Sequence, residues 1–134
     1  MGMFNVNILP ASTGLSLGST VQQWKINGLI PAQIVVTATA FSSSPGFTSS
    51  SPLPVFTITL TGNVTSSAMS LSGVAQAIVI FQITQDGTGG RTFTWPPNFI
   101  QPSVIGLSAN QVTTQIFYFD GTNAWPLGPG MSTP

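Results

Sequence analysis

The chain has 134 residues, of which 42% are hydrophobic and only 3% are charged, against roughly 25% charged residues in an ordinary soluble domain. This length suits one domain, and a surface so poor in charge favours coverage by other copies of the chain or by neighbouring subunits. The only two cations, Lys25 and Arg91, are far apart in the sequence, which argues against a nucleic-acid or anionic-membrane partner.

The first predicted element is an alternating segment at the N-terminus. Phe4, Val6 and Ile8 fall on one face of this segment and asparagines fall on the other. We therefore expect residues 1–10 to form an edge strand or an inter-subunit arm, which would cover an exposed sheet edge. The segment has neither a basic region nor a long apolar region, so it is not expected to be a signal peptide.

Five further segments have the alternation or the β-branched composition of strands, namely residues 33–41, 55–62, 77–85, 91–95 and 112–120. No window carries the periodic apolar stripe of a helix. The Ser/Pro-rich residues 42–54 are expected to be a long surface loop. With about seven to nine short strands, the chain is predicted to be all-β, an antiparallel β-sandwich or jelly-roll-like fold in which residues 11–134 form a single domain.

Glycine-containing turns separate these strands. The sequence "DGTGG" at 86–90 predicts a hairpin with a glycine-rich loop between 77–85 and 91–95. A tight reversal is expected after residue 120, where "DG" precedes "TNAW". The residues predicted to shape turns are Asn27, Gly28, Asp86, Gly87, Gly89, Gly90, Asp120 and Gly121.

Ser16 lies in "GLSLG", which fits the G-x-S-x-G pattern of a serine hydrolase. A serine hydroxyl needs a base to remove its proton, and the chain has no histidine. A nucleophile elbow also requires a preceding strand and a following helix, and neither pattern is present. We therefore predict that Ser16 shapes the backbone and that the protein is not an enzyme.

The only two acids are Asp86 and Asp120, so a glycosidase-type carboxylate pair would have to consist of these two residues. A glycine follows each of them directly, which favours a turn function instead. The sequence "GTGGRT" lacks the Lys-Ser/Thr ending of a phosphate loop. Without histidine or cysteine, a zinc site is not expected, and no spacing supports calcium, so the sequence predicts no cofactor and no metal.

The tryptophans Trp24, Trp95 and Trp125, together with Tyr118, are expected to be core or interface residues. The open alternative is that an exposed tryptophan stacks on a host sugar.

Two stretches of the sequence resemble a β domain that is common in virion proteins of tailed bacteriophages. The first is "LTGNVTSSAMSLSGVAQAIVIFQITQDGTGGRTFTWPPNF", in which "QDGTGGRTFTWP" is the most specific run, and the second is "QIFYFDGTNAWPLG". The segment "ILPASTGLSLGSTVQQW" is similar to the opening found ahead of such domains in tail-fibre-like proteins. The resemblance implies a structural phage protein, a homo-oligomer on the exterior of the virion.

The chain is short and has no coiled coil, collagen-like repeat or extended stalk. For that reason we expect first a capsid decoration or head-fibre subunit, with a trimer favoured, that contacts copies of itself and the major capsid protein through buried surface and multivalent attachment. The alternative is a tail-fibre or receptor-binding module that recognises host surface glycan.

Overall fold

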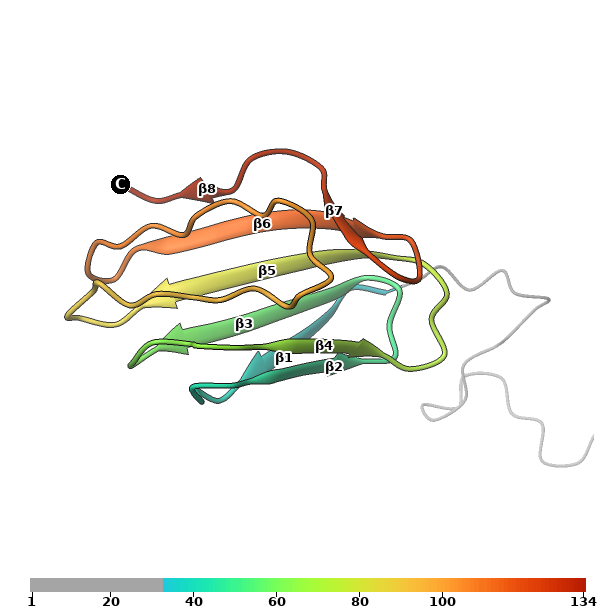
Figure 1. The fold of residues 1–134 in the computed structure, drawn as a ribbon, viewed down its shortest axis with the longest axis horizontal. Coiled ribbons are helices and arrows are strands. Elements are labelled where there is room, and N and C mark those ends of the chain that lie inside the picture. The colour runs from blue at the N-terminus through green and yellow to red at the C-terminus, as the bar shows by residue number, and fades with distance from the viewer. Residues whose placement is uncertain (1–32) are drawn as a thin grey trace, which may run out of the picture. The chain divides into compact units, whose positions relative to one another are not determined.

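The computed structural model describes residues 33–134, which form an all-β unit of eight strands without a helix in that range. The prediction of an all-β fold is confirmed for this part of the chain. The predicted seven to nine strands were counted over the whole chain, and residues 33–134 alone contain eight. The strands, labelled in Figure 1, are β1 (Val35–Thr39), β2 (Gly46–Ser49), β3 (Pro54–Leu60), β4 (Ala68–Leu71), β5 (Ala77–Gln85), β6 (Val112–Phe119), β7 (Ala124–Pro126) and β8 (Met131–Ser132).

The larger of the two sheets is mixed, so the prediction of a purely antiparallel fold is wrong. Its strand order is β1-β3-β5-β6-β7, and β8 also pairs with β6. The strands β1, β3 and β5 are parallel to one another, whereas all pairs made by β6 are antiparallel. Alternation in the sequence indicates which side chains face the core, but it does not encode the direction of the neighbouring strand.

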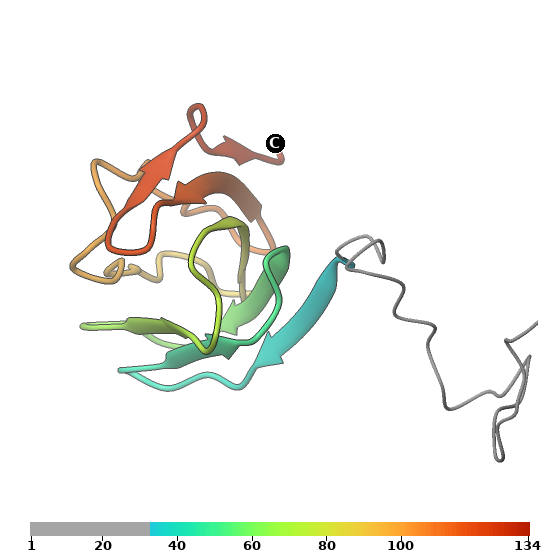
Figure 2. The same ribbon diagram turned by 90° about the vertical axis from the view of Figure 1, so that its right-hand side faces the viewer.

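The parallel half of the sheet is built as a coil of two turns. Parallel strands require a crossover connection, and here each crossover passes through the second sheet, which consists of β2 and β4 paired in parallel. The chain thus runs from β1 through β2 to β3, and then through β4 to β5. Figures 1 and 2 show β2 and β4 as a separate layer against the large sheet.

The predicted surface loop at 42–54 is in part a core strand. It contains β2, in which the side chain of Phe47 is completely buried. The ring centroid of Phe47 lies 4.9 Å from that of Phe81 and 5.5 Å from that of Phe56. A four-residue strand with one inward side chain is too short to show a periodic pattern between Ser/Pro-rich flanks, so the sequence by itself predicts a loop there.

The predicted hairpin from 77–85 to 91–95 is also wrong, because β5 pairs with β6 and not with the residues after the glycine-rich turn. Residues 91–95 form no strand, and Phe93 makes only an isolated bridge to Val64. The segment 86–111 instead crosses over β5 and β6 as irregular chain, seen in orange in Figure 1. It places Phe99 and Ile105, both 6% exposed, in the core.

Two buried glutamines tie this irregular layer to the sheet. The amide nitrogen of Gln85 donates to the carbonyls of Arg91 (2.8 Å) and Gly106 (2.9 Å), and its oxygen accepts from the N–H of Arg91 (2.9 Å). The side-chain oxygen of Gln115 accepts from the N–H of Ser103 at 2.9 Å. Both side chains are at most 2% exposed. Since an irregular segment cannot pair its own backbone groups, such side-chain partners are needed where it is buried.

Phe47→Ala should destabilise the unit strongly, because it leaves a cavity between the two sheets. We expect a loss of about 3–5 kcal/mol in the free energy of unfolding, measured by urea denaturation of the full chain. Phe41→Ala is the matched control and should cost clearly less, since Phe41 is already 36% exposed. Equal losses for both variants would contradict the assignment of β2 as a core strand.

Candidate functional site

The structure places both acids in turns, each with its carboxylate occupied. One oxygen of Asp86 accepts from the N–H groups of Thr88 (3.0 Å) and Gly89 (2.9 Å). The other accepts from Nε (3.1 Å) and Nη2 (2.8 Å) of Arg91. The Arg91 hydrogen bonds, followed by that of the Gly89 N–H, lower the pKa of Asp86. This carboxylate stabilises the glycine-rich turn as an anion, and no second carboxylate lies beside it.

Close backbone approach explains two of the glycines in these turns. Gly89 has a φ of +75°, and a Cβ there would lie 2.7 Å from the amide nitrogen of Ala109 and the carbonyl oxygen of Leu107. Gly121 has a φ of +103°, and its Cβ would lie 2.8 Å from the carbonyl oxygen of Ala75. A side chain at either position would collide with backbone, so both turns require glycine.

The second turn connects β6 to β7 and carries the more notable arrangement. One oxygen of Asp120 accepts from the N–H groups of Thr122 (2.9 Å) and Asn123 (2.8 Å), while the other accepts from the indole N–H of Trp125 at 2.8 Å. The pKa of Asp120 is lowered, first by the bond from the Asn123 backbone and then by the indole. One aspartate thus closes the turn and fixes the orientation of a tryptophan ring.

Trp125 combines this fixed orientation with exposure. It is 43% exposed on β7, where it lies directly opposite the half-buried Tyr118 of β6. A residue of the segment 86–111 also stabilises this turn: the side-chain amide of Asn98 donates to the carbonyl of Thr122 at 2.8 Å. A flat aromatic face that is both exposed and held in place is suited to stacking against a ligand.

The other predicted aromatic and arm residues do not join this site. Trp95 is partly buried and packs against the aromatic core, with ring centroids 5.3 Å from Phe81 and 5.2 Å from Phe117, and its indole N–H donates to the carbonyl of Ser103 at 3.1 Å. Outside the described residues lie Phe4, Val6, Ile8, Ser16, Trp24, Asn27 and Gly28, and with them the predicted domain boundary after residue 10.

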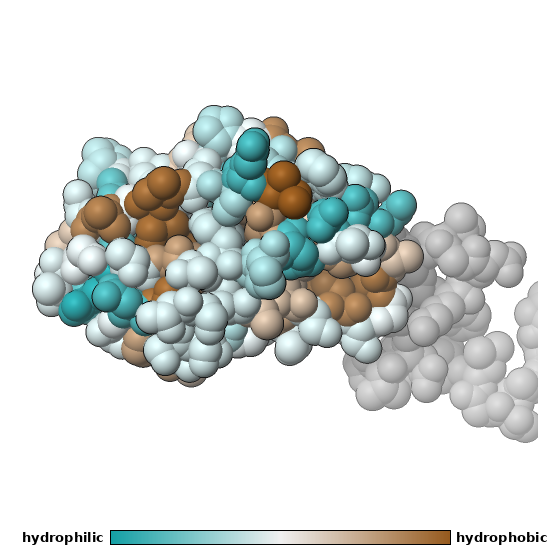
Figure 3. Space-filling model, in the orientation of Figure 1, coloured by the Kyte–Doolittle hydropathy of each residue, from teal (hydrophilic) through white to brown (hydrophobic). Residues whose placement is uncertain are grey.

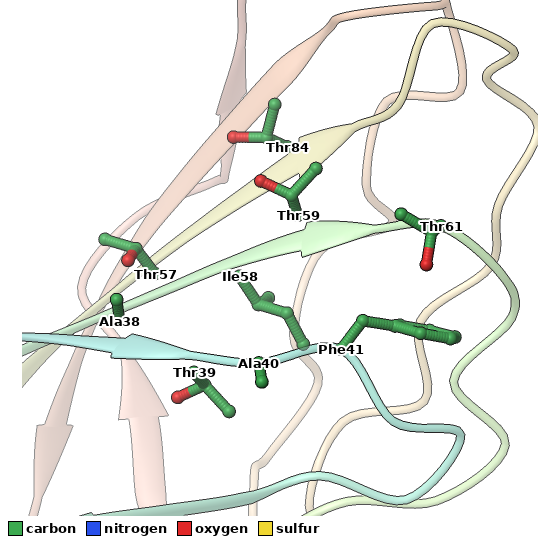
Figure 4. A pocket seen from close by; sticks show the side chains of 9 residues that line it. All are labelled: Ala38, Thr39, Ala40, Phe41, Thr57, Ile58, Thr59, Thr61 and Thr84. Atoms are coloured by element: carbon green, nitrogen blue, oxygen red, sulfur yellow. The ribbon is translucent and has the colours of Figure 1, made fainter.

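Two shallow hollows open on the unit. One, of about 300 Å³, lies on β6 between the C-terminal strands and is lined by residues that include Ile116, Leu127 and Met131. The other, of about 310 Å³, lies at the end of β1 and is shown in Figure 4. Neither contains a charged side chain, and residues 33–134 contain no cluster of three metal-ligating side chains. In the same range, no helix is long and apolar enough to span a membrane.

Figure 3 views the face that carries β2, β4 and the segment 86–111. Hydrophobic residues lie there as separate patches among hydrophilic and neutral ones. The exposed apolar side chains of that segment include Val104 (87%) and Leu107 (50%).

Comparison with protein families finds that residues 44–124 match the family described as "Putative phage tail fibre C-terminal domain". The match covers more than half of the chain. This chain belongs to that family. No curated protein and no solved structure matches it.

Membership of the tail-fibre family confirms the expectation of a structural phage protein and implies a location in the virion. A structural role also agrees with the prediction that the protein is not an enzyme. The family fits the predicted tail-fibre alternative better than the capsid decoration expected first from the sequence. The spacing of Asp120 and Trp125 is visible in the sequence, but its meaning was missed because a hydrogen bond across five residues follows only from the turn geometry.

The bond between Asp120 and Trp125 should survive mild acid. The folded pKa of Asp120 is lowered from 3.8, so the stabilisation by its carboxylate is complete above that pH and is lost as the pH falls through the lowered value. The indole N–H resonance of Trp125, assigned by its disappearance in Trp125→Phe, should therefore stay constant from pH 7 to pH 4 and move only below. In Asp120→Asn this movement should be absent. A midpoint at or above 3.8 in the unsubstituted protein would contradict the bonding described.

Proposed function

We propose that this tail-fibre domain recognises glycan on the host surface and that the face of Trp125 is its contact point. The observation that carries the proposal is the exposed indole held at a fixed angle by Asp120. Apolar residues exposed singly are common on protein surfaces. Trp125 differs from these because its indole N–H donates a charge-assisted hydrogen bond to the carboxylate of Asp120. This bond fixes the ring, so the side chain loses little conformational freedom on binding.

The chemistry around the ring favours neutral sugars. A sugar ring presents C–H groups on its faces and hydroxyls around its rim, which match an apolar ring flanked by polar groups. Trp125 supplies the ring, and exposed Thr122 and part-exposed Asn123 lie in the adjoining turn. The negative charge of Asp120 is compensated internally by three N–H donors, so it offers little to a cationic ligand.

Trp125→Ala should weaken adsorption of the full-length protein to host cells by roughly tenfold or more, as expected for an aromatic at the centre of a contact. Fluorescently labelled protein on host cells gives this number directly, and a glycan array identifies the sugar. Trp125→Phe should retain part of the binding because it keeps an aromatic face.

Val104→Ala is the control, since Val104 is 87% exposed on a different segment and should not affect adsorption. Loss of binding in both alanine variants, or in neither, would contradict the assignment of the Trp125 face. Saturable binding that survives Trp125→Ala would leave a receptor-binding role but exclude this site.

The number of copies per virion tests the tail-fibre role separately. Quantitative mass spectrometry of purified particles should find a handful of copies, as expected of a fibre. Hundreds of copies would instead support decoration of the capsid.

A further inference from the structure

The apolar hollow on β6 adjoins the tryptophan of the candidate site along the strand. Trp125 lies opposite Tyr118 on the outer face of the large sheet. Two residues further along, Leu127 lies beside Ile116, because its N–H donates to the carbonyl of Ile116 at 3.0 Å. Two residues of a strand span about 6.7 Å and point their side chains to the same face. Since Leu127 and Ile116 both line the hollow, it begins one side-chain position away from Trp125.

The lining of this hollow is apolar except at one point. The side chains of Ile116, Leu127 and Met131 are 41%, 59% and 73% exposed. Thr114 is the one residue with a polar side chain among the described residues that line the hollow, and Met131 lies opposite it in register. A volume of about 300 Å³ is at the lower bound of ligand pockets, so the hollow suits one substituent of a ligand and not an entire oligosaccharide.

The connection from β7 to β8, at the top of Figure 1, forms one wall of the hollow and is anchored by hydrogen bonds. The side-chain amide of Gln115, which is 2% exposed, donates to the carbonyl of Gly128 at 3.0 Å. Two residues later, the N–H of Gly130 donates to the hydroxyl of Ser103 at 2.8 Å. These bonds hold the wall in place, so a ligand does not have to order it on binding.

We propose that the hollow is a second subsite of the glycan site and receives the acetamido group of a neutral N-acetylhexosamine. This inference rests on the function proposed above, because the ring of the sugar stacks on Trp125. The acetyl methyl group packs on the apolar lining beside Leu127 and Met131. The amide of the substituent meets the hydroxyl of Thr114, which can both donate and accept a hydrogen bond.

Two features of the lining select this substituent. A purely apolar substituent, such as the methyl group of a 6-deoxy sugar, would leave the Thr114 hydroxyl without a partner once water is excluded, which costs free energy. A carboxylate would need a cation, and the one cation among residues 33–134, Arg91, forms an ion pair with Asp86 at 2.8 Å. A neutral acetamido group matches both the apolar floor and the hydroxyl.

Matched pairs of sugars test the subsite. The methyl glycosides of N-acetylglucosamine, N-acetylgalactosamine and N-acetylmannosamine are titrated into the full chain, each against the glycoside that has a hydroxyl in place of the acetamido group. In at least one pair the acetamido sugar should bind at least about fivefold more tightly, as expected for one buried methyl group and one hydrogen bond. In NMR spectra it should shift both the indole N–H of Trp125 and the methyl group of Met131, while its partner shifts only the indole.

Two substitutions should reduce this preference without removing the stacking. Leu127→Ser takes away apolar surface, and Thr114→Val takes away the hydroxyl at nearly constant volume. Each should weaken binding of the acetamido sugar by about threefold and leave binding of its hydroxyl partner unchanged. Leu107→Ser is the matched control and should change neither affinity, since Leu107 is comparably exposed (50%) on the segment 86–111.

The outcomes separate the two proposals. Equal affinity within every pair, or a 6-deoxy glycoside that binds as tightly as the acetamido sugar, would overturn the subsite and leave Trp125 as a glycan contact. A preference that survives both Leu127→Ser and Thr114→Val would do the same. If no sugar shifts the indole resonance of Trp125, the proposed function fails together with the subsite.

Discussion

The packing around Phe81 is the constraint on which the rest of the unit depends. This side chain lies on the inner face of β5, the central strand of the large sheet, and is completely buried. Its ring centroid lies within 6.3 Å of those of five other aromatics, Phe47, Phe56, Trp95, Phe99 and Phe117. These come from β2, β3, β6 and the irregular segment 86–111. One cluster of rings therefore holds together a regular layer and an irregular one.

The irregular segment 86–111 can be buried because polar side chains of the sheet supply the hydrogen bonds that a neighbouring strand would otherwise provide. Gln85 at the end of β5 binds both limbs of the segment 86–111, and Gln115 of β6 binds its later part. These two amides are as buried as the aromatics, and a buried polar group without a partner would be costly. The apolar core therefore provides burial without directional preference, and the hydrogen bonds of Gln85 and Gln115 determine where the segment 86–111 lies on the sheet.

The sequence predicts the long strands well and their arrangement poorly. The bounds of β5 match the predicted 77–85, and those of β6 differ from 112–120 by one residue, because both strands alternate over eight or nine positions. The parallel direction of β1, β3 and β5 could not be predicted, since it depends on crossovers through β2 and β4, each only four residues long. In β2, Phe47 is the one fully buried side chain, and a single buried residue produces no periodic pattern that sequence analysis could recognise.

For the candidate site, the sequence predicts the turn at Asp120 but does not predict that the Trp125 side chain is exposed. The pair Asp120–Gly121 indicates a reversal locally, but whether Trp125 enters the core or remains at the surface depends on register with Tyr118. Trp95 has a similar local sequence context but is partly buried, because its ring packs against Phe81, Phe99 and Phe117. Exposure of an aromatic is therefore a tertiary property, fixed by which face of which strand it occupies.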